Sequence, residues 1–188
     1  ANNLSAEYSR IYGSDSLKQE VLKISSCLPK TTGVIDLGCG SGAQSYWLGE
    51  LGYKVIGIDH SQVSIQNAKK QQSPNCTFLC TDINDFLDGS IMSLSSYKTV
   101  FMSHVLEHID DPAGLLSMLS ANFNFIYIEV PDFQSCPLNP ARIKVGARLY
   151  SDDDHVWEFD LNSLLKLASE SGWKCEYSEV HQGVISYY

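Results

Sequence analysis

The chain of 188 residues lacks several features that would place it in other classes of protein. It has no apolar run near the ~20 residues that a membrane-spanning helix needs. Its longest apolar runs, such as Phe125 to Val130, have only the length of a strand. The first ten residues carry neither the basic start nor the apolar run of a secretory signal. We therefore expect one cytoplasmic domain spanning residues 1–188, with no membrane partner.

Basic residues and paired cysteine motifs are also scarce. The chain has 13 Lys and Arg against 22 Asp and Glu, a net charge of −9 that opposes attraction to a phosphate backbone. A nucleic-acid partner is therefore disfavoured. The six cysteines form no CxxC pair, and several lie in apolar runs, which predicts reduced, structural thiols. Nothing in the sequence indicates an oligomeric state.

Strands and helices are predicted to alternate along most of the chain. Apolar runs predict strands at 33–37, 54–59, 77–81, 99–103 and 125–130. Helical spacing of apolar residues, with Ser61 as a cap and Pro112 at a first turn, predicts helices at 17–28, 43–51, 61–70, 112–121 and 162–171. Two closing strands at 173–180 and 184–188 are expected to form a hairpin.

This order predicts an α/β fold. The first five strands are nearly continuous apolar runs, as expected when helices cover both faces of a parallel sheet. We expect a doubly wound, mostly parallel sheet with a C-terminal antiparallel hairpin. Residues 131–157 carry three prolines, show no clear periodicity and are too long for an ordinary connection. We interpret them as an insertion that covers the substrate.

The strongest chemical signal is a glycine-rich loop between the first strand and the next helix. It runs from Asp36 to Gly42 (DLGCGSG), and its glycines let the backbone approach a ligand closely. Asp59 ends the second strand 21 residues after Gly38, where a carboxylate can accept hydrogen bonds from both ribose hydroxyls. Together these features favour an adenosine-containing cofactor.

Two classes of enzyme share this pattern. Gly38, Gly40 and Ala43 also satisfy the G-x-G-x-x-A fingerprint of NAD(P)-dependent oxidoreductases. Asp36 discriminates between them, because a carboxylate near the loop suits a cationic amino-acid tail and would repel a pyrophosphate. The oxidoreductase alternative also leaves Asp36 and the segment from Ser103 to His108 (SHVLEH) unexplained.

Four segments resemble those of class I methyltransferases, which use S-adenosylmethionine (SAM). Residues 34–42 (VIDLGCGSG) are similar to the family's first motif, and 81–83 (TDI) to its adenine-contacting motif. Residues 103–112 resemble the SxxLEHxxDP segment, and 155–159 the HxWxF segment, of a subfamily that acts on sugars, quinones and small metabolites. The resemblance spans roughly residues 30–175 and implies a Rossmann-like fold.

The resemblance implies SAM as cofactor and S-adenosylhomocysteine (SAH) as product. Residues 1–30 resemble a helical lid over the cofactor. Asp82 and Ile83 are expected at the adenine, with a helix cap as the alternative role of Asp82. The full set of expected cofactor positions is Asp36, Gly38, Cys39, Gly40, Gly42, Asp59, His60, Asp82, Ile83, Ser103 and, in the lid, Tyr12.

Three histidines are candidate catalytic groups. If the acceptor is a hydroxyl, a base of near-neutral pKa helps to remove its proton, and His108 and His155, then His104, are the candidates. Each competes with a purely structural role. The run from His104 to His108 also matches H-x-x-E-H, an inverted zinc-peptidase signature. That signature needs a long helix, whereas Pro112 follows four residues after His108, so we expect no metal.

The acceptor is less constrained. The KPGG turn common before the fifth strand in this family is replaced by Ser120 to Asn124, and no substrate signature is present. We expect a small molecule, a sugar or related metabolite, with the choice among O-, N- and C-methylation open. The alternative from another class is a catalytically silent SAM-binding module.

Overall fold

The computed structural model describes residues 14–30, 32–71, 73–90, 94–135, 138–145, 154–181 and 183–188. The chain divides into two compact units, Ala1–Ser90 and Ile91–Tyr188. No helix within the described residues combines the length and apolar character needed to cross a membrane. The expected lid residue Tyr12 lies outside the described residues.

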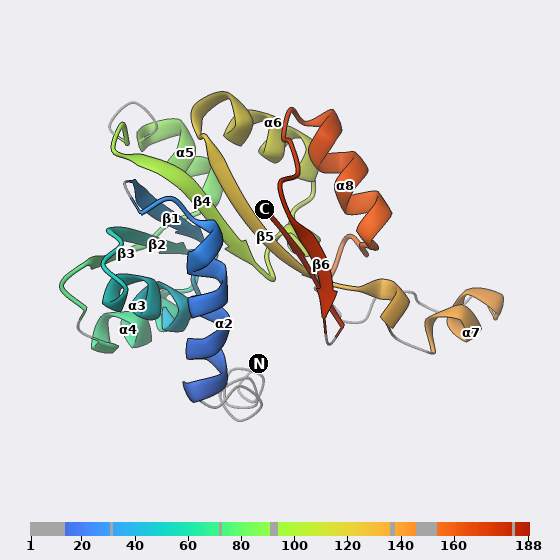
Figure 1. Cartoon of the computed structure of the whole chain (residues 1–188), viewed down its shortest axis with the longest axis horizontal. Coiled ribbons are helices and arrows are strands. Elements are labelled where there is room, and N and C mark those ends of the chain that lie inside the picture. The colour runs from blue at the N-terminus through green and yellow to red at the C-terminus, as the bar shows by residue number, and fades with distance from the viewer. Residues whose placement is uncertain are drawn as a thin grey trace. The chain divides into compact units, whose positions relative to one another are not determined.

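The first unit contains three parallel strands and their connecting helices (Figure 1). The strands lie in the order β3-β2-β1, with Ile35 opposite Ile56 and Ile56 opposite Thr77. In chain order the elements are α2 (Ser14–Cys27), β1 (Gly33–Leu37), α3 (Ala43–Glu50), β2 (Val55–Asp59), α4 (Gln62–Ala68), the 3-10 turn η1 (Lys69–Gln71), β3 (Cys76–Cys80) and α5 (Ile83–Ser90).

Buried apolar side chains and local caps explain these elements. Every residue of β1 is buried, as expected for a parallel strand that is covered on both faces. The Ser61 hydroxyl accepts a hydrogen bond from the Ser64 amide, which confirms Ser61 as the cap of α4. The Tyr53 hydroxyl donates to the carbonyls of Ser25 and Leu28, so the end of α2 is tied to the chain before β2.

The second unit contains a parallel pair of strands joined to an antiparallel hairpin. The strand order is β4-β5-β7-β6, and the hairpin confirms the predicted closing strands. The elements are β4 (Tyr97–Ser103), η3 (Leu106–His108), α6 (Pro112–Asn122), β5 (Phe125–Pro131), η4 (Phe133–Ser135), α7 (Asn139–Lys144), α8 (Leu161–Glu170), β6 (Ser178–His181) and β7 (Val184–Tyr187).

Both long helices of this unit begin at an aspartate. Asp111 caps α6 by accepting from the Gly114 amide, and Pro112 occupies the first turn, as predicted. Asp160 and Ser163 form a reciprocal capping box at the start of α8. The indole of Trp173 donates to the Leu116 carbonyl and ties the chain after α8 to α6.

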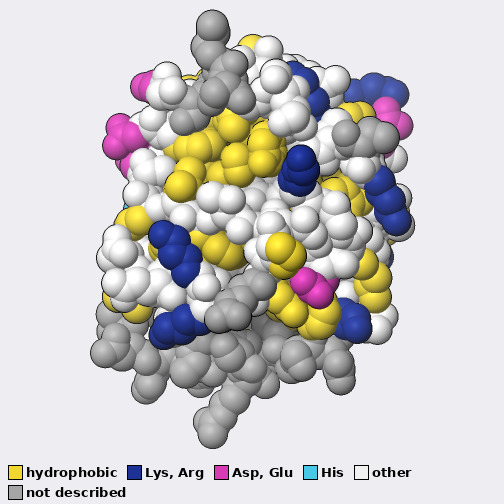
Figure 2. All heavy atoms as spheres, turned by 90° about the vertical axis from the view of Figure 1, so that its left-hand side faces the viewer, with side chains coloured by type: hydrophobic (Ala, Val, Ile, Leu, Met, Phe, Trp, Pro, Cys, Tyr) yellow, Lys and Arg dark blue, Asp and Glu magenta, His cyan; other side chains and the backbone are white. Residues whose placement is uncertain are grey.

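Several sequence predictions were wrong in detail. Helix α5 was not predicted, and neither was the short helix α7 inside the expected insertion. Strand β6 begins at Ser178, five residues later than expected. Strand β3 is not covered on both faces, since of its five residues only Phe78 is buried and Leu79 is 39% exposed. Figure 2, which faces the left-hand side of Figure 1, shows hydrophobic side chains gathered on that side of the molecule.

Gly42 is required by close packing at the start of α3. Its φ of 77° lies in the left-handed region, and a Cβ there would come within 2.8 Å of both the Ala68 Cβ and the Phe78 ring. Gly89 offers a matched control, because a Cβ at that position in α5 meets nothing within 4 Å.

We predict that Gly42→Ala destabilises the protein by about 2–4 kcal/mol, since left-handed strain and overpacking each cost about 1–3 kcal/mol. Gly89→Ala should be neutral or slightly stabilising, because alanine favours a helix by up to about 1 kcal/mol. Unfolding in urea measures both free energies. Equal effects of the two substitutions would contradict the packing argument.

Candidate functional site

Three glycines shape the turn between β1 and α3. Gly38, Gly40 and Gly42 all have positive φ, at 72°, 53° and 77°. Gly40 differs from Gly42 in its surroundings, because, apart from its two chain neighbours, no described residue has an atom within 4 Å of a Cβ built on it. The turn therefore combines a glycine that packs on the protein with a glycine that faces open space, as a loop that admits a ligand to its backbone requires.

Asp59 holds this turn against the end of β2. Its Oδ2 accepts from the Gly40 amide at 2.8 Å, and its Oδ1 accepts from the Ser61 amide at 2.7 Å. A backbone hydrogen bond from the Cys39 amide to the Ile58 carbonyl also links the turn to β2. Each carboxylate oxygen can accept a second hydrogen bond, so Asp59 can hold the loop and still receive ligand hydroxyls.

Asp36 lies beneath the turn, 2% exposed. Its Oδ2 accepts from the Ser45 hydroxyl at 2.5 Å. Burial raises the pKa of Asp36 to about 7; the Ser45 hydrogen bond opposes this, and the charge of Asp59 adds to it. Burial, with Asp36 and Asp59 nearby, also raises the pKa of the Cys39 thiol far above its usual value, so this thiol stays protonated.

The other expected cofactor positions have mixed surroundings. Asp82 is exposed, and its Oδ1 accepts from the Asn84 amide, so it does cap a helix, α5. Ile83 is half-buried beside it, and His60 is exposed at the end of β2. Ser103 ends β4 in the second unit and donates to Glu129. Their roles toward a cofactor stay predictions.

In the second unit the chain turns sharply after β4, at His104. Among the described residues, His104 is the only one other than glycine with positive φ, at 54°. Its amide donates to the Glu129 carbonyl. The buried Glu129 carboxylate accepts from the Ser103 hydroxyl at 2.8 Å and from the Tyr127 hydroxyl at 2.9 Å. This network fixes the turn that presents His104.

The HxWxF segment docks on this turn. The Glu107 carbonyl accepts from the amides of Val156 and Trp157, at 2.9 and 3.1 Å. The Nδ1 atom of His108 lies 3.0 Å from the Asp154 carbonyl oxygen. The imidazole rings of His108 and His155 meet edge to face, with centroids 4.9 Å apart. Two segments about 47 residues apart in the sequence are thus brought together, a contact that was not predicted from the sequence.

The zinc-peptidase alternative fails on this geometry. It needs His104 and His108 on one face of a long helix. The structure instead has a positive φ at His104 and a 3-10 turn of three residues, Leu106–His108. The two histidines therefore do not form the paired ligands of that signature.

Sequence reasoning missed three supporting residues. Ser45 bonds to Asp36, Glu129 braces the β4 turn, and Glu158 lies 3.3 Å from the Nδ1 atom of His155. Ser45 follows the glycine loop by one helical turn, and Glu158 follows His155 by three residues, so their spacing could have suggested the first and the last. Tyr127 is two residues from Glu129 on the same strand, but the bond from Ser103 could not be found in this way, because that contact depends on the register of β4 and β5.

Comparison with known proteins places the chain in a family. A model of the methyltransferase domain matches residues 9–178. The chain belongs to this methyltransferase domain family. It is a class I SAM-dependent methyltransferase domain with an α/β Rossmann-like fold, as the sequence predicted.

Similar curated proteins include ubiquinone biosynthesis O-methyltransferases. The mitochondrial protein of Schizosaccharomyces pombe is 32% identical over 88 residues, which are 46% of this chain and 32% of that protein. That of Coxiella burnetii is 31% identical over 91 residues, 47% of this chain and 37% of that protein. These matches therefore span only about a third of the relatives' length.

Solved structures share the fold. Magnesium protoporphyrin IX methyltransferase from Synechocystis PCC 6803, with bound SAH, has a TM-score of 0.68 and 17% identity, covering 100% of this chain and 88% of that one. A SAM-dependent methyltransferase from Archaeoglobus fulgidus has a TM-score of 0.70 and 20% identity, covering 94% and 78%. At these identities the likeness shows the fold alone.

The buried Asp36 carboxyl predicts a pH-dependent stability. Between pH values near 4 and near 7, the folded protein holds a proton on Asp36 that the unfolded chain releases. Stability should therefore fall as pH rises through this range and level off above about pH 7, by up to about 4 kcal/mol. Unfolding in urea at pH 4.5 to 8 measures this slope.

Asp36→Asn isolates the contribution of this carboxyl. Asparagine resembles the protonated acid, so the variant should match the parent near pH 4.5 and exceed its stability near pH 8. Asp88→Asn, at an exposed position of α5, is the control and should follow the parent throughout. Parallel curves for the parent and Asp36→Asn would show that Asp36 ionises normally.

Proposed function

We propose that this protein transfers a methyl group from SAM to a small-molecule acceptor. The observation that carries the proposal is the turn around Gly40, which faces open space while its amide bonds to Asp59. The turn joins a ligand-accessible backbone, a carboxylate at the end of β2 and a buried acid below it. Family membership supports the same reading.

On the cofactor side, Asp59 would receive the ribose hydroxyls through the lone pairs that its two backbone hydrogen bonds leave. Asp82 and Ile83 would meet the adenine. The cationic amino group of SAM would favour the ionised form of Asp36, whose pKa is otherwise raised to about 7 by burial. Cys39, His60, Ser103 and Tyr12 complete the proposed set.

On the acceptor side, we propose that a histidine of the second unit acts as the base. His104 has the features of an oriented base, because its Nδ1 atom lies 3.5 Å from Oε1 of the buried Glu107. A carboxylate at that nitrogen favours the tautomer that leaves a lone pair on the other. His108 and His155 are fixed in the same manner, by the Asp154 carbonyl and by Glu158.

The chemistry needs little beyond positioning. The acceptor oxygen attacks the methyl carbon bonded to the sulfonium, and the sulfur takes the electron pair of the broken bond to become the thioether of SAH. A base receives the proton of the acceptor hydroxyl. Holding the oxygen ~3 Å from the methyl carbon in line with the sulfur supplies much of the rate enhancement.

We propose a hydroxyl-bearing acceptor, a sugar or related metabolite. The relatives named as O-methyltransferases of ubiquinone biosynthesis support methylation at oxygen. The net charge of −9 argues against a nucleic acid. These matches cover only about a third of each relative, so they do not identify the acceptor of this protein.

Titration with SAH tests the cofactor proposal. We expect binding in the micromolar range, measured by calorimetry, with at least a tenfold loss in Asp59→Ala and a smaller loss in Asp59→Asn, which keeps one acceptor oxygen for the loop. Asp88→Asn should bind like the parent. Thermal unfolding of each variant separates lost binding from lost folding. Binding of NADH in place of SAH would contradict the proposal.

Methyl transfer to a panel of sugars, phenols and amines then separates the enzyme from a silent binding module. We expect turnover on a hydroxyl acceptor. SAH binding without turnover on any member of the panel would favour the module.

With such an acceptor, His104→Gln should lower kcat by about 10²–10⁴-fold, the usual contribution of a general base. It should also abolish the fall in rate at acidic pH. His181→Gln, at an exposed position of β6, should leave both unchanged. A pH profile that keeps its acidic limb in His104→Gln would assign the base elsewhere.

A further inference from the structure

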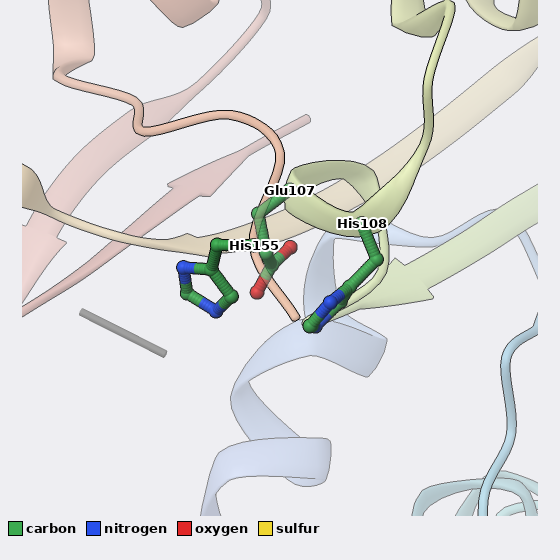
Figure 3. A group of neighbouring side chains, drawn as sticks. All are labelled: Glu107, His108 and His155. Atoms are coloured by element: carbon green, nitrogen blue, oxygen red, sulfur yellow. The ribbon is translucent and has the colours of Figure 1, made fainter. Parts of the chain in front are cut away.

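A buried glutamate and two histidines meet in the second unit, at the turn after β4. One ligand atom from each of Glu107, His108 and His155 lies within 4.8 Å of the others. Figure 3 shows the Glu107 carboxylate between the two imidazole rings, with the side chains converging from η3 and the HxWxF segment. This donor set shares His108 with the rejected peptidase pair, but its other members are Glu107 and His155 in place of His104.

Among these three residues, Glu107 is buried without hydrogen bonds from the described residues that would compensate its charge. The residue is 1% exposed, and neither carboxylate oxygen has a hydrogen-bond partner in the described structure. The Nδ1 atom of His104, 3.5 Å from Oε1, is its nearby titratable neighbour. A buried carboxylate is costly unless a cation or hydrogen-bond donors compensate its charge.

The two histidines are held in the tautomer that binds metal ions. A carbonyl oxygen can only accept, so the Nδ1 atom of His108, 3.0 Å from the Asp154 carbonyl, must carry the proton. The Nδ1 atom of His155 faces the Glu158 carboxylate at 3.3 Å in the same way. In each neutral ring the lone pair then lies on Nε2. A carbonyl or carboxylate at the second nitrogen is the usual outer shell of a metal-bound histidine.

We propose that Glu107, His108 and His155 bind a divalent transition-metal ion of the Zn²⁺ class. Two imidazoles and one carboxylate suit Zn²⁺, Co²⁺ or Fe²⁺, whereas Mg²⁺ and Ca²⁺ prefer oxygen ligands. The set leaves at least one coordination position for water or another oxygen ligand. His155 is 8% exposed and His108 is exposed, so the ion is held inside but has an entry path.

The rearrangement that binding requires is small. With bonds of about 2.0–2.1 Å, tetrahedral ligands lie about 3.3 Å apart, so the atoms must approach by up to about 1.5 Å. His108 is exposed, so its side chain has room to adjust. Hydrogen bonds from Val156 and Trp157 to the Glu107 carbonyl already hold the two segments together.

Cobalt titration of the tag-free full chain tests the site, because Co²⁺ substitutes for Zn²⁺ and is visible. We expect one Co²⁺ per chain, with d–d absorption in the visible range. No thiolate charge-transfer band should appear, because the proposed ligands are nitrogen and oxygen atoms and no cysteine takes part. Zn²⁺ should displace it. No stoichiometric binding, or a thiolate band, would overturn the proposal.

Variants assign the ligands. His108→Gln, His155→Gln and Glu107→Gln should each weaken Co²⁺ binding at least tenfold, and Glu158→Gln should weaken it about tenfold by releasing the Nδ1 atom of His155. His181→Gln is the control and should bind like the parent. Binding unchanged in all three ligand variants would overturn the assignment. If a variant fails to fold, the spectrum of the parent protein still decides the ligand chemistry.

These readouts need neither cofactor nor acceptor. Loss of SAH binding would therefore overturn the proposed methyl transfer and leave the metal site standing. Absence of Co²⁺ binding would do the reverse, and would return His108 and His155 to the role of candidate bases.

Discussion

Two hydrogen bonds to one carboxylate organise the glycine turn of the first unit. Asp59 ends β2 and accepts from the amides of Gly40 and Ser61, so one side chain positions both the glycine turn and the start of α4. The turn must pass close to β2 to make the first bond, and only the left-handed glycines permit that path. Together with the hydrogen bond from the Cys39 amide to the Ile58 carbonyl, this pair of bonds fixes the distance between the loop and β2.

Local signals in the sequence predicted the glycine turn and the starts of α4 and α6. The glycine cluster, the Ser61 cap and the Pro112 start each act within a few residues of the element they define, so they can be read without knowledge of the fold. Helix α5 was not predicted, although a cap was the alternative role considered for Asp82, and the hydrogen bond from the Asn84 amide establishes that role. The two roles need not compete, since one oxygen of Asp82 caps the helix.

Contacts that depend on strand register, and exposure that depends on a strand's place in the sheet, could not be predicted from the sequence. The bond between Ser103 and Glu129 exists because these residues are opposite one another in β4 and β5. The exposure of Leu79 follows from the place of β3 in the strand order, since nothing within its apolar run distinguishes an outer strand from a central one. The contact of His108 with His155 was not predicted, because it joins segments far apart in the sequence.

Three buried carboxylates show how the protein separates structural from responsive groups. Glu129 accepts from two hydroxyls and is satisfied within the described structure, which suits a brace for the β4 turn. Asp36 has one hydroxyl donor, and burial raises its pKa to about 7. A cation beside it would therefore favour its ionised form. Neither oxygen of Glu107 has a hydrogen-bond partner among the described residues, although the Nδ1 atom of His104 lies 3.5 Å from its Oε1. The fewer donors the fold supplies, the more the charge of that carboxylate depends on what binds beside it. Asp36 and Glu107 are therefore the positions where cations should couple most strongly to stability, whereas Glu129 should be indifferent to them.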